Sequence, residues 1–297
     1  MKNLKTIFFV LALSFVVQAT AQQDPHFSLY KYNMNIISPA YAGTNGSLEA
    51  MFGVRSQWVG IPDGPEILNF NINSPIGKNV GVGLSIVNDQ VFVLEETHLY
   101  ADFSYKIQVG NDLNLYAGVK AGGTFLNVDL NALDIDDDPL FAENVSNFNP
   151  NIGVGFYLKA PQYYVTVSAP SLLKNDRFER EGVVPVSASD DVSFFLGGGG
   201  DFVISRSLDN TFKLRPSTLI RAVNGSPISI DLTASGVFND RFELGANYRL
   251  DESVTFFITA GFIDSVLHFG YAYEYTTTDV GTYNNGTHEI IMKLKLK

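Results

Sequence analysis

The chain has 297 residues, no cysteine and a formal net charge of -11 at pH 7. The absence of cysteine excludes disulfides, a thiol nucleophile and a cysteine-ligated zinc. The acidic balance argues against a nucleic-acid binder, which normally carries a basic patch. After the N-terminus no apolar run reaches the roughly 18 residues that a membrane-spanning helix needs, which excludes a multi-span helical membrane protein.

Residues 1–21 have the layout of a signal peptide. Lys2 and Lys5 precede an apolar run over residues 7–17, and Ala19-Thr20-Ala21 matches an A-x-A cleavage site. The apolar run is too short to cross a bilayer. We therefore expect cleavage after Ala21 and export of a chain that begins at Gln22.

Residues 22–47 form a separate, irregular segment before the alternating region. They include Pro25 and Pro39 and show no alternation of polar and apolar side chains. Their aromatic residues favour an ordered segment over a free tail. The sequence leaves open whether this pre-barrel segment makes periplasmic contacts or folds into a barrel lumen as a plug.

From residue 48 to residue 297 the dominant pattern has a period of two, as in strands whose successive side chains face opposite sides. About fourteen such segments have roughly the 9–11 residues of a tilted membrane strand. Short connections alternate with longer ones, and the longest lie at 127–148, 171–189 and 276–287. Outer-membrane barrels have short periplasmic turns and long external loops. The sequence therefore predicts an all-β transmembrane antiparallel β-barrel over residues 48–297.

Charged residues and glycines fall on one face of these predicted strands. The charged set is Glu49, Arg55, Asp102, Lys106, Lys120, Asp231, Glu243, Arg249, Glu274 and Glu289. A charge that faces lipid at mid-bilayer costs roughly 2–4 kcal/mol, so this face is the lumen. The lumen-facing glycines are Gly81, Gly83, Gly118, Gly122, Gly153, Gly155, Gly245 and Gly270. They either permit sheet curvature or leave room for an inserted segment.

Several motifs, in order along the mature chain, resemble one known family. The stretch from Gln23 through Pro39, Ala40 and Gly43 resembles the opening of the PorP/SprF family of the type IX secretion system and gliding machinery, although the family usually has Asn where Ser38 stands. The next landmark is Arg55-Ser56-Gln57-Trp58, and the terminal one is Thr287-His288-Glu289-Ile290. The resemblance covers essentially the whole mature chain.

The resemblance implies an outer-membrane accessory or anchor protein without enzymatic activity. It implies partners of two kinds: the C-terminal signal domain of a large secreted surface protein such as an adhesin, and periplasmic peptidoglycan-binding or motor-associated components. The barrel pattern alone is also compatible with a porin-like channel for small solutes. An open lumen would favour that alternative.

Sequence patterns for enzymatic chemistry are weak. The four histidines include His98 and His268, which we expect at opposite rims of the barrel, about 25 Å apart and too distant to share a metal. Residues 134–138 are rich in aspartate, but Pro139 stands where a calcium loop of the EF-hand type needs glycine. We expect no catalytic site, no resident metal and no cofactor.

Partner binding is expected on the long external loops, because the short turns offer little area and a stable complex buries about 1,200–2,000 Å². The candidate contact residues are Asp134, Asp136, Asp137, Asp138, Glu143, Lys174, Arg177 and Arg180. A basic patch on the cargo would be steered to the acidic members of this set.

Overall fold

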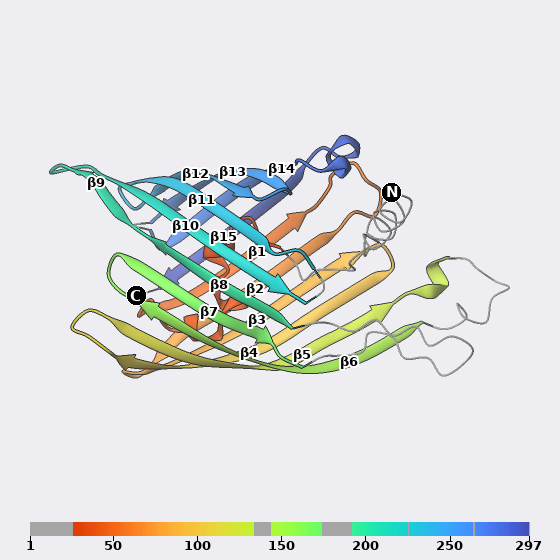
Figure 1. Cartoon of the computed structure of the whole chain (residues 1–297), viewed down its shortest axis with the longest axis horizontal. Helices are drawn as coiled ribbons and strands as arrows, with labels where there is room; N and C mark the ends of the chain where they lie inside the picture. Colours follow the sequence, from red (N-terminus) through yellow and green to blue (C-terminus); the bar gives the residue numbers. More distant parts are fainter. Residues whose placement is uncertain (1–25, 134–143, 174–191, 225, 264, 297) are drawn as a thin grey trace, which may run out of the picture.

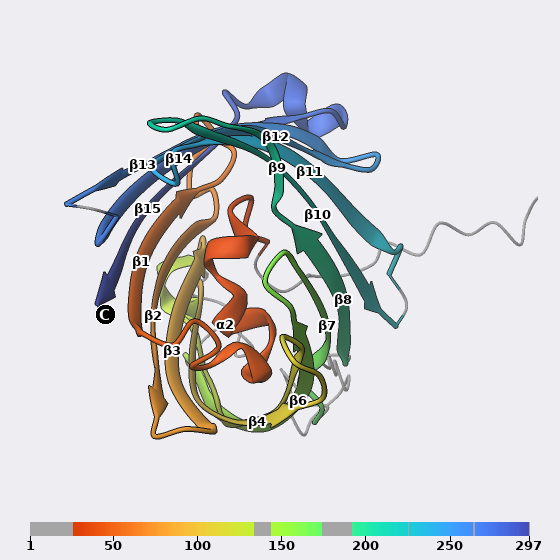
Figure 2. The ribbon, with the colours of Figure 1, turned by 90° about the vertical axis from the view of Figure 1, so that its left-hand side faces the viewer.

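The computed structural model describes residues 26–133, 144–173, 192–224, 226–263 and 265–296, and these form a β-barrel around a short helical segment (Figures 1 and 2). The first barrel strands are β1 (Leu48–Ser56), β2 (Glu66–Ile76), β3 (Val80–Val91), β4 (Leu94–Gln108), β5 (Asn114–Val128), β6 (Val145–Lys159), β7 (Tyr163–Ser171) and β8 (Ser193–Gly200). The remaining strands are β9 (Phe202–Arg206), β10 (Thr211–Val223), β11 (Ser229–Phe238), β12 (Phe242–Arg249), β13 (Ser253–Phe262), β14 (Leu267–Thr276) and β15 (Thr287–Leu296). The helical pieces are η1 (Tyr30–Tyr32), α2 (Met34–Ile37), η2 (Pro39–Tyr41), η3 (Leu130–Leu133) and η5 (Asp279–Tyr283).

The strands form one closed antiparallel ring. Apart from β8 and β9, neighbouring strands in the sequence pair with each other, and β1 pairs with β15 over nine residue pairs, from Leu48 opposite Leu296 to Ser56 opposite His288. The strands β8 and β9 both pair with β10 and are two parts of one barrel strand, interrupted at Asp201. The barrel therefore has fourteen strands, as the alternation predicts. The interruption at Asp201 was not predicted.

Side-chain parity along the strands agrees with the assignment of lipid and lumen faces. In β11, Leu232 is 49% exposed on the outer wall, while the neighbouring Asp231 is 6% exposed and points inward. The outer wall of other strands likewise carries exposed Phe103, Phe156 and Ile258. Within the described ranges, no helix is long and apolar enough to cross a membrane.

The two ends of the barrel differ in the length of their connections (Figure 1). We call them the short-turn end, with turns at 77–79, 109–113, 160–162, 207–210, 239–241 and 263–266, and the long-loop end, with connections at 57–65, 129–144, 172–192 and 277–286. The predicted loop at 127–148 is too long, because β5 extends to Val128 and β6 begins at Val145. Phe125 and Phe148 pack across this extension, with ring centroids 4.7 Å apart.

Candidate functional site: the filled lumen

The segment that precedes the first strand lies inside the barrel (Figure 2). Its helical pieces η1, α2 and η2 are largely buried, with Tyr30 at 2% and Ala40 at 0% exposure. Met34 and Tyr41 belong to its core cluster, which also includes wall residues such as Ile67. The segment therefore forms the packed centre of the barrel. We call residues 26–47 the lumen segment.

Half of the lumen-facing glycines make room for this segment. A Cβ atom at Gly81 or Gly118 would overlap the backbone of Ala42 or Ala40, respectively. At Gly83 it would come within 2.9 Å of the Asn35 amide, and at Gly155 it would press on Ser38 and Pro39. Such close approach of two backbones requires residues without a side chain.

The other half of the glycine set has a different role. At Gly122, Gly153, Gly245 and Gly270 an added Cβ would meet neighbouring strands and not the lumen segment. These positions permit close packing and curvature within the sheet itself. The two explanations that the sequence left open therefore each apply, to different glycines.

The start of the lumen segment is held by a buried charged cluster. Arg55 on β1 forms ion pairs with Glu274 on β14 (3.1 Å) and Glu289 on β15 (3.4 Å), and it donates to the Ser28 hydroxyl (2.8 Å). Glu289 in turn accepts from the backbone N–H groups of Ser28 (2.8 Å) and Leu29 (3.3 Å). Arg55 and Glu289 are each 1% exposed. Their charges are thus compensated by one another and by the segment's own backbone.

The middle of the segment is hydrogen-bonded to the opposite wall. Asn35 donates to Asp102 on β4 (3.0 Å), and its carbonyl accepts from Lys120 on β5 (3.2 Å). Lys120 and Asp102 form an ion pair at 2.9 Å. The Ser168 hydroxyl on β7 donates to the carbonyl of Ile37 (2.8 Å). Because the partners come from strands all around the ring, the segment is fixed in both depth and rotation.

The last part of the segment lies at the short-turn end. The Tyr41 hydroxyl donates to Glu49 (2.9 Å), and the Asn45 amide donates to both Tyr41 (2.8 Å) and Glu49 (3.0 Å). Lys293 pairs with Glu49 at 3.2 Å. Lys159 donates to the carbonyl of Thr44 (3.0 Å) and to the Asn45 side chain. This cluster places the chain for its entry into β1.

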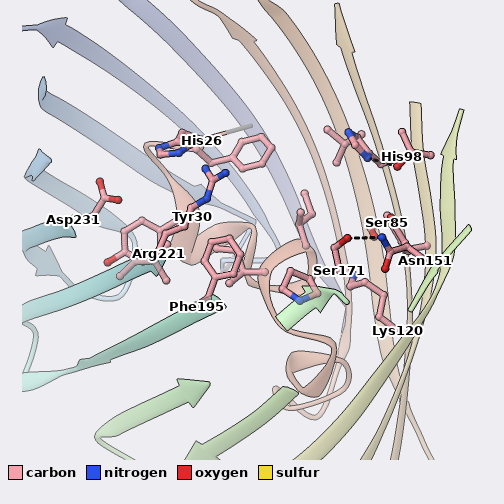
Figure 3. A pocket seen from close by; sticks show the side chains of 18 of the residues that line it. His26, Tyr30, Ser85, His98, Lys120, Asn151, Ser171, Phe195, Arg221 and Asp231 are labelled. Carbon is pink, nitrogen blue, oxygen red and sulfur yellow. Dashed lines mark hydrogen bonds between the residues drawn. The ribbon is translucent and has the colours of Figure 1, made fainter. Parts of the chain in front are cut away.

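A cavity of about 120 Å³ lies between the lumen segment and the long-loop end (Figure 3). Its lining combines apolar side chains such as Phe27 and Phe195 with polar and charged ones such as His98 and Arg221. His26 lies at its edge. Burial, and then the guanidinium groups of Arg249, Arg221 and Arg55, hold the pKa of His26 well below its usual range. His26 is therefore neutral at pH 7 and lies among cations.

The residues singled out by the family motifs lie in four places. Pro39 and Ala40 form η2 within the lumen, and Arg55 and Glu289 belong to the buried charged cluster. Gln57 and Trp58 lie in the connection after β1, where the backbone N–H of Trp58 donates to the Thr287 hydroxyl (3.2 Å). His288 is on the outer wall, where its Nδ1 is 2.8 Å from the Tyr271 hydroxyl.

The predicted loop contacts belong to the connections at 129–144 and 172–192. These predicted contacts lie outside the described residues: Asp134, Asp136, Asp137, Asp138, Glu143, Lys174, Arg177 and Arg180.

In the described part of the chain no group of three or more histidine, aspartate or glutamate side chains is arranged to hold a metal ion. His98 on β4 lies near the long-loop end, 2.7 Å from the Thr124 hydroxyl, and His268 on β14 lies near the short-turn end, 3.0 Å from the Ser265 carbonyl.

Sequence reasoning predicted the inward charges but not which of them contact the lumen segment. It missed the asparagine series on β2, where Asn71 donates to Asn33 (3.0 Å) and Asn73 accepts from the Gly43 N–H (3.1 Å). The available signal was the spacing of Asn69, Asn71 and Asn73 on one face of a strand. Consecutive amides on a lumen face offer donors and acceptors to an irregular backbone.

Comparison with known proteins found a matching family model and several similar solved structures. The family model described as "Type IX secretion system membrane protein PorP/SprF" matches residues 19–294. No curated protein matches. Similar solved structures include the CymD monoaromatic hydrocarbon channel, with 12% identity, 88% of this chain and 91% of that chain covered, and a TM-score of 0.48. Another is Omp33 of Acinetobacter baumannii, with 9% identity, 84% and 97% covered, and a TM-score of 0.47.

Proposed function

The chain belongs to the PorP/SprF family of type IX secretion system membrane proteins, and on this premise we propose that it helps to export or retain a large surface protein through that protein's C-terminal signal domain. The family and the fold are those of an outer-membrane barrel of a secretion system and not of a known enzyme class. The surface protein would be an adhesin of the gliding machinery.

The observation that carries this proposal is the filled lumen. A closed ring has no free sheet edge, so a partner must bind at the ends of the barrel or in the lumen. The lumen segment is hydrogen-bonded to strands around the ring, from Ser28 near β15 to Ser38 near β7. Its packed position argues for a scaffold and against a wide solute channel.

We assign the cargo to the long-loop end. The connections at 129–144, 172–192 and 277–286 are the longest there, and a stable complex needs about 1,200–2,000 Å² in total. The proposed contacts are Asp134, Asp136, Asp137, Asp138, Glu143, Lys174, Arg177 and Arg180, with the acids attracting a basic patch on the cargo. The short-turn end would face the periplasm, where it contacts peptidoglycan-binding or motor-associated components.

The test is to shorten residues 134–143 and 175–181 in a strain that carries the cargo. We expect normal barrel levels in the outer membrane and loss of the adhesin from the cell surface. A matched control shortens the β9–β10 turn at 207–210, which lies at the other end of the barrel. If the adhesin still reaches and stays on the surface when both loops are cut, the assignment is wrong.

The porin-like alternative is tested by conductance in planar bilayers. We propose that the lumen segment acts as a plug, so the intact protein should give no large steady current, and deletion of residues 24–41 should raise the current. Large currents from the intact protein would support the channel instead. Sequencing the N-terminus of the purified protein tests the proposed signal-peptide cleavage after Ala21.

A further inference from the structure

Unpaired charge of opposite sign is found at the two ends of the barrel. At the short-turn end, five cations have no carboxylate of the described residues within ion-pair distance: Lys78, Lys106, Lys159, Arg206 and Lys295. The acids at this end that likewise have no ion-pair partner among the described residues are Asp112 and Asp209. At the long-loop end the unpaired groups of the described chain are acids, among them Asp63, Asp129 and Asp251. The short-turn end is therefore locally positive in a protein whose net charge is -11.

Part of this positive charge surrounds a cavity. A space of about 240 Å³ lies between the lumen segment and the wall near the short-turn end, and its lining includes Lys31, Lys159 and Lys293. The Lys159 ammonium group is attracted by the Glu49 carboxylate and repelled by the ammonium groups of Lys295 and Lys293. We call this cavity the lysine vestibule; Lys159 and Lys293 line it, and Lys295 lies outside the lining but close enough to act on the charge of Lys159.

The carboxylates near the vestibule offset its positive charge only in part, because each of them is shared with other partners. Glu49 is shared by Lys293, Tyr41 and Asn45. The acceptors of Lys159 are an amide oxygen and a backbone carbonyl, which are both neutral. On the other side of the cavity Glu243 and Asp201 are already engaged by Lys31 and Arg215. A positive charge that is partly shielded from water attracts anions more strongly than one at an open surface.

The walls of the vestibule are aromatic and firmly packed. Tyr157 and Tyr164 stack at 5.3 Å between ring centroids, and Tyr41 meets Tyr157 edge to face at 5.7 Å. Because a water molecule takes up about 30 Å³, the cavity has the volume of about eight waters, which is enough for an acidic side chain. This size favours a polypeptide over a glycan, because an acidic side chain can enter while its backbone stays outside, whereas the carboxylate of a uronic acid is attached directly to the sugar ring.

We propose that the lysine vestibule binds an acidic segment of a partner polypeptide, which enters from the short-turn end and places carboxylates against Lys159 and Lys295. The location of this partner in the periplasm rests on the proposed function. The binding itself does not, because it depends only on the charge and shape of the cavity.

The experiment uses the purified full-length protein in detergent and a fluorescent poly-glutamate peptide, with binding followed by anisotropy. A poly-glutamine peptide of equal length and polygalacturonate, a carboxylated glycan, are the comparison ligands. We expect the glutamate peptide to bind and the other two not to bind, with affinity falling as salt is raised. Lys159→Gln and Lys295→Gln should each weaken binding about tenfold, as expected for the loss of a charge-assisted hydrogen bond.

Two further variants keep the test decisive. Lys78→Gln removes an exposed cation on the turn between β2 and β3, outside the cavity, and should leave the affinity unchanged. Glu49→Gln removes the carboxylate next to Lys293 and should tighten binding, which gives an informative result even if a lysine variant fails to fold. Equal binding of poly-glutamine, binding of polygalacturonate alone, or an affinity that is insensitive to Lys159, Lys295 and Glu49 would each overturn the proposal. Failure of the unaltered protein to bind the glutamate peptide, in a strain that displays the adhesin normally, would overturn this inference and leave the proposed function intact.

Discussion

Substitution of Arg55 by methionine should release the start of the lumen segment while the barrel stays closed. Arg55 is 1% exposed and is the shared partner of Glu274 (3.1 Å) and Glu289 (3.4 Å). Removal of one partner from a buried ion pair costs about 3–5 kcal/mol, because the remaining charge stays buried without compensation. Release of the segment would let water reach both glutamates and so relieve this cost.

The lower end of that range applies here. Arg249 lies 3.8 Å from Glu274 and remains in the variant, and Glu289 keeps its hydrogen bonds from the Ser28 and Leu29 N–H groups. At about 3 kcal/mol, the open fraction of the segment should rise roughly 100-fold. The strand ladders of β1, β14 and β15 do not depend on the Arg55 side chain, so their amide protection should change little.

Hydrogen exchange of the backbone amides of residues 27–33, measured on the protein in detergent, checks this value. Lys213→Met is the matched control, since its ion pair with Asp240 involves a carboxylate that is 58% exposed, and exposed pairs contribute about 0–1 kcal/mol. Adding Glu274→Gln and Glu289→Gln to Arg55→Met should restore part of the protection. Wild-type exchange in Arg55→Met, or equal loss of protection in segment and strands, would refute the reasoning.

Three other changes test the fold and the lumen. Gly118→Val should expel the lumen segment, because the new side chain would overlap the backbone of Ala40. The expulsion should appear as new protease cleavage within residues 26–47. Ala117→Val, on the outer wall of the same strand, should behave as wild type. Leu232→Arg should lower barrel assembly far more than Asp231→Asn, since a lipid-facing charge costs roughly 2–4 kcal/mol; equal surface levels of the two variants would contradict the register. Acidification should loosen the start of the lumen segment. The pKa of His26 in the folded protein lies below its unfolded value of about 6.5, so the stability that neutral His26 contributes is present above pH 6.5 and is lost as the pH falls below it. His26→Phe should abolish this pH dependence of amide exchange.

The sequence alone determined the wall of the barrel. A period of two is a local property of each strand, so alternation such as Asp231 against Leu232 assigns every side chain to lumen or lipid without knowledge of its partners. Loop lengths then fixed which strand ends lie together. The break at Asp201 and the extension of β5 and β6 beyond Asn127 and Phe148 were missed, because both depend on pairing with a neighbouring strand.

The interior of the barrel was decided only by the tertiary structure. The lumen segment has no periodicity, and its contacts join residues far apart in the chain, such as Ser28 with Glu289 and Asn35 with Asp102. Closing the ring brings β1 beside β15, and only then does Arg55 lie between Glu274 and Glu289. For the same reason the sequence could not separate Gly118, which faces the segment, from Gly245, which faces its own sheet. The wall follows from short-range periodicity, whereas the contents of the lumen follow from long-range packing.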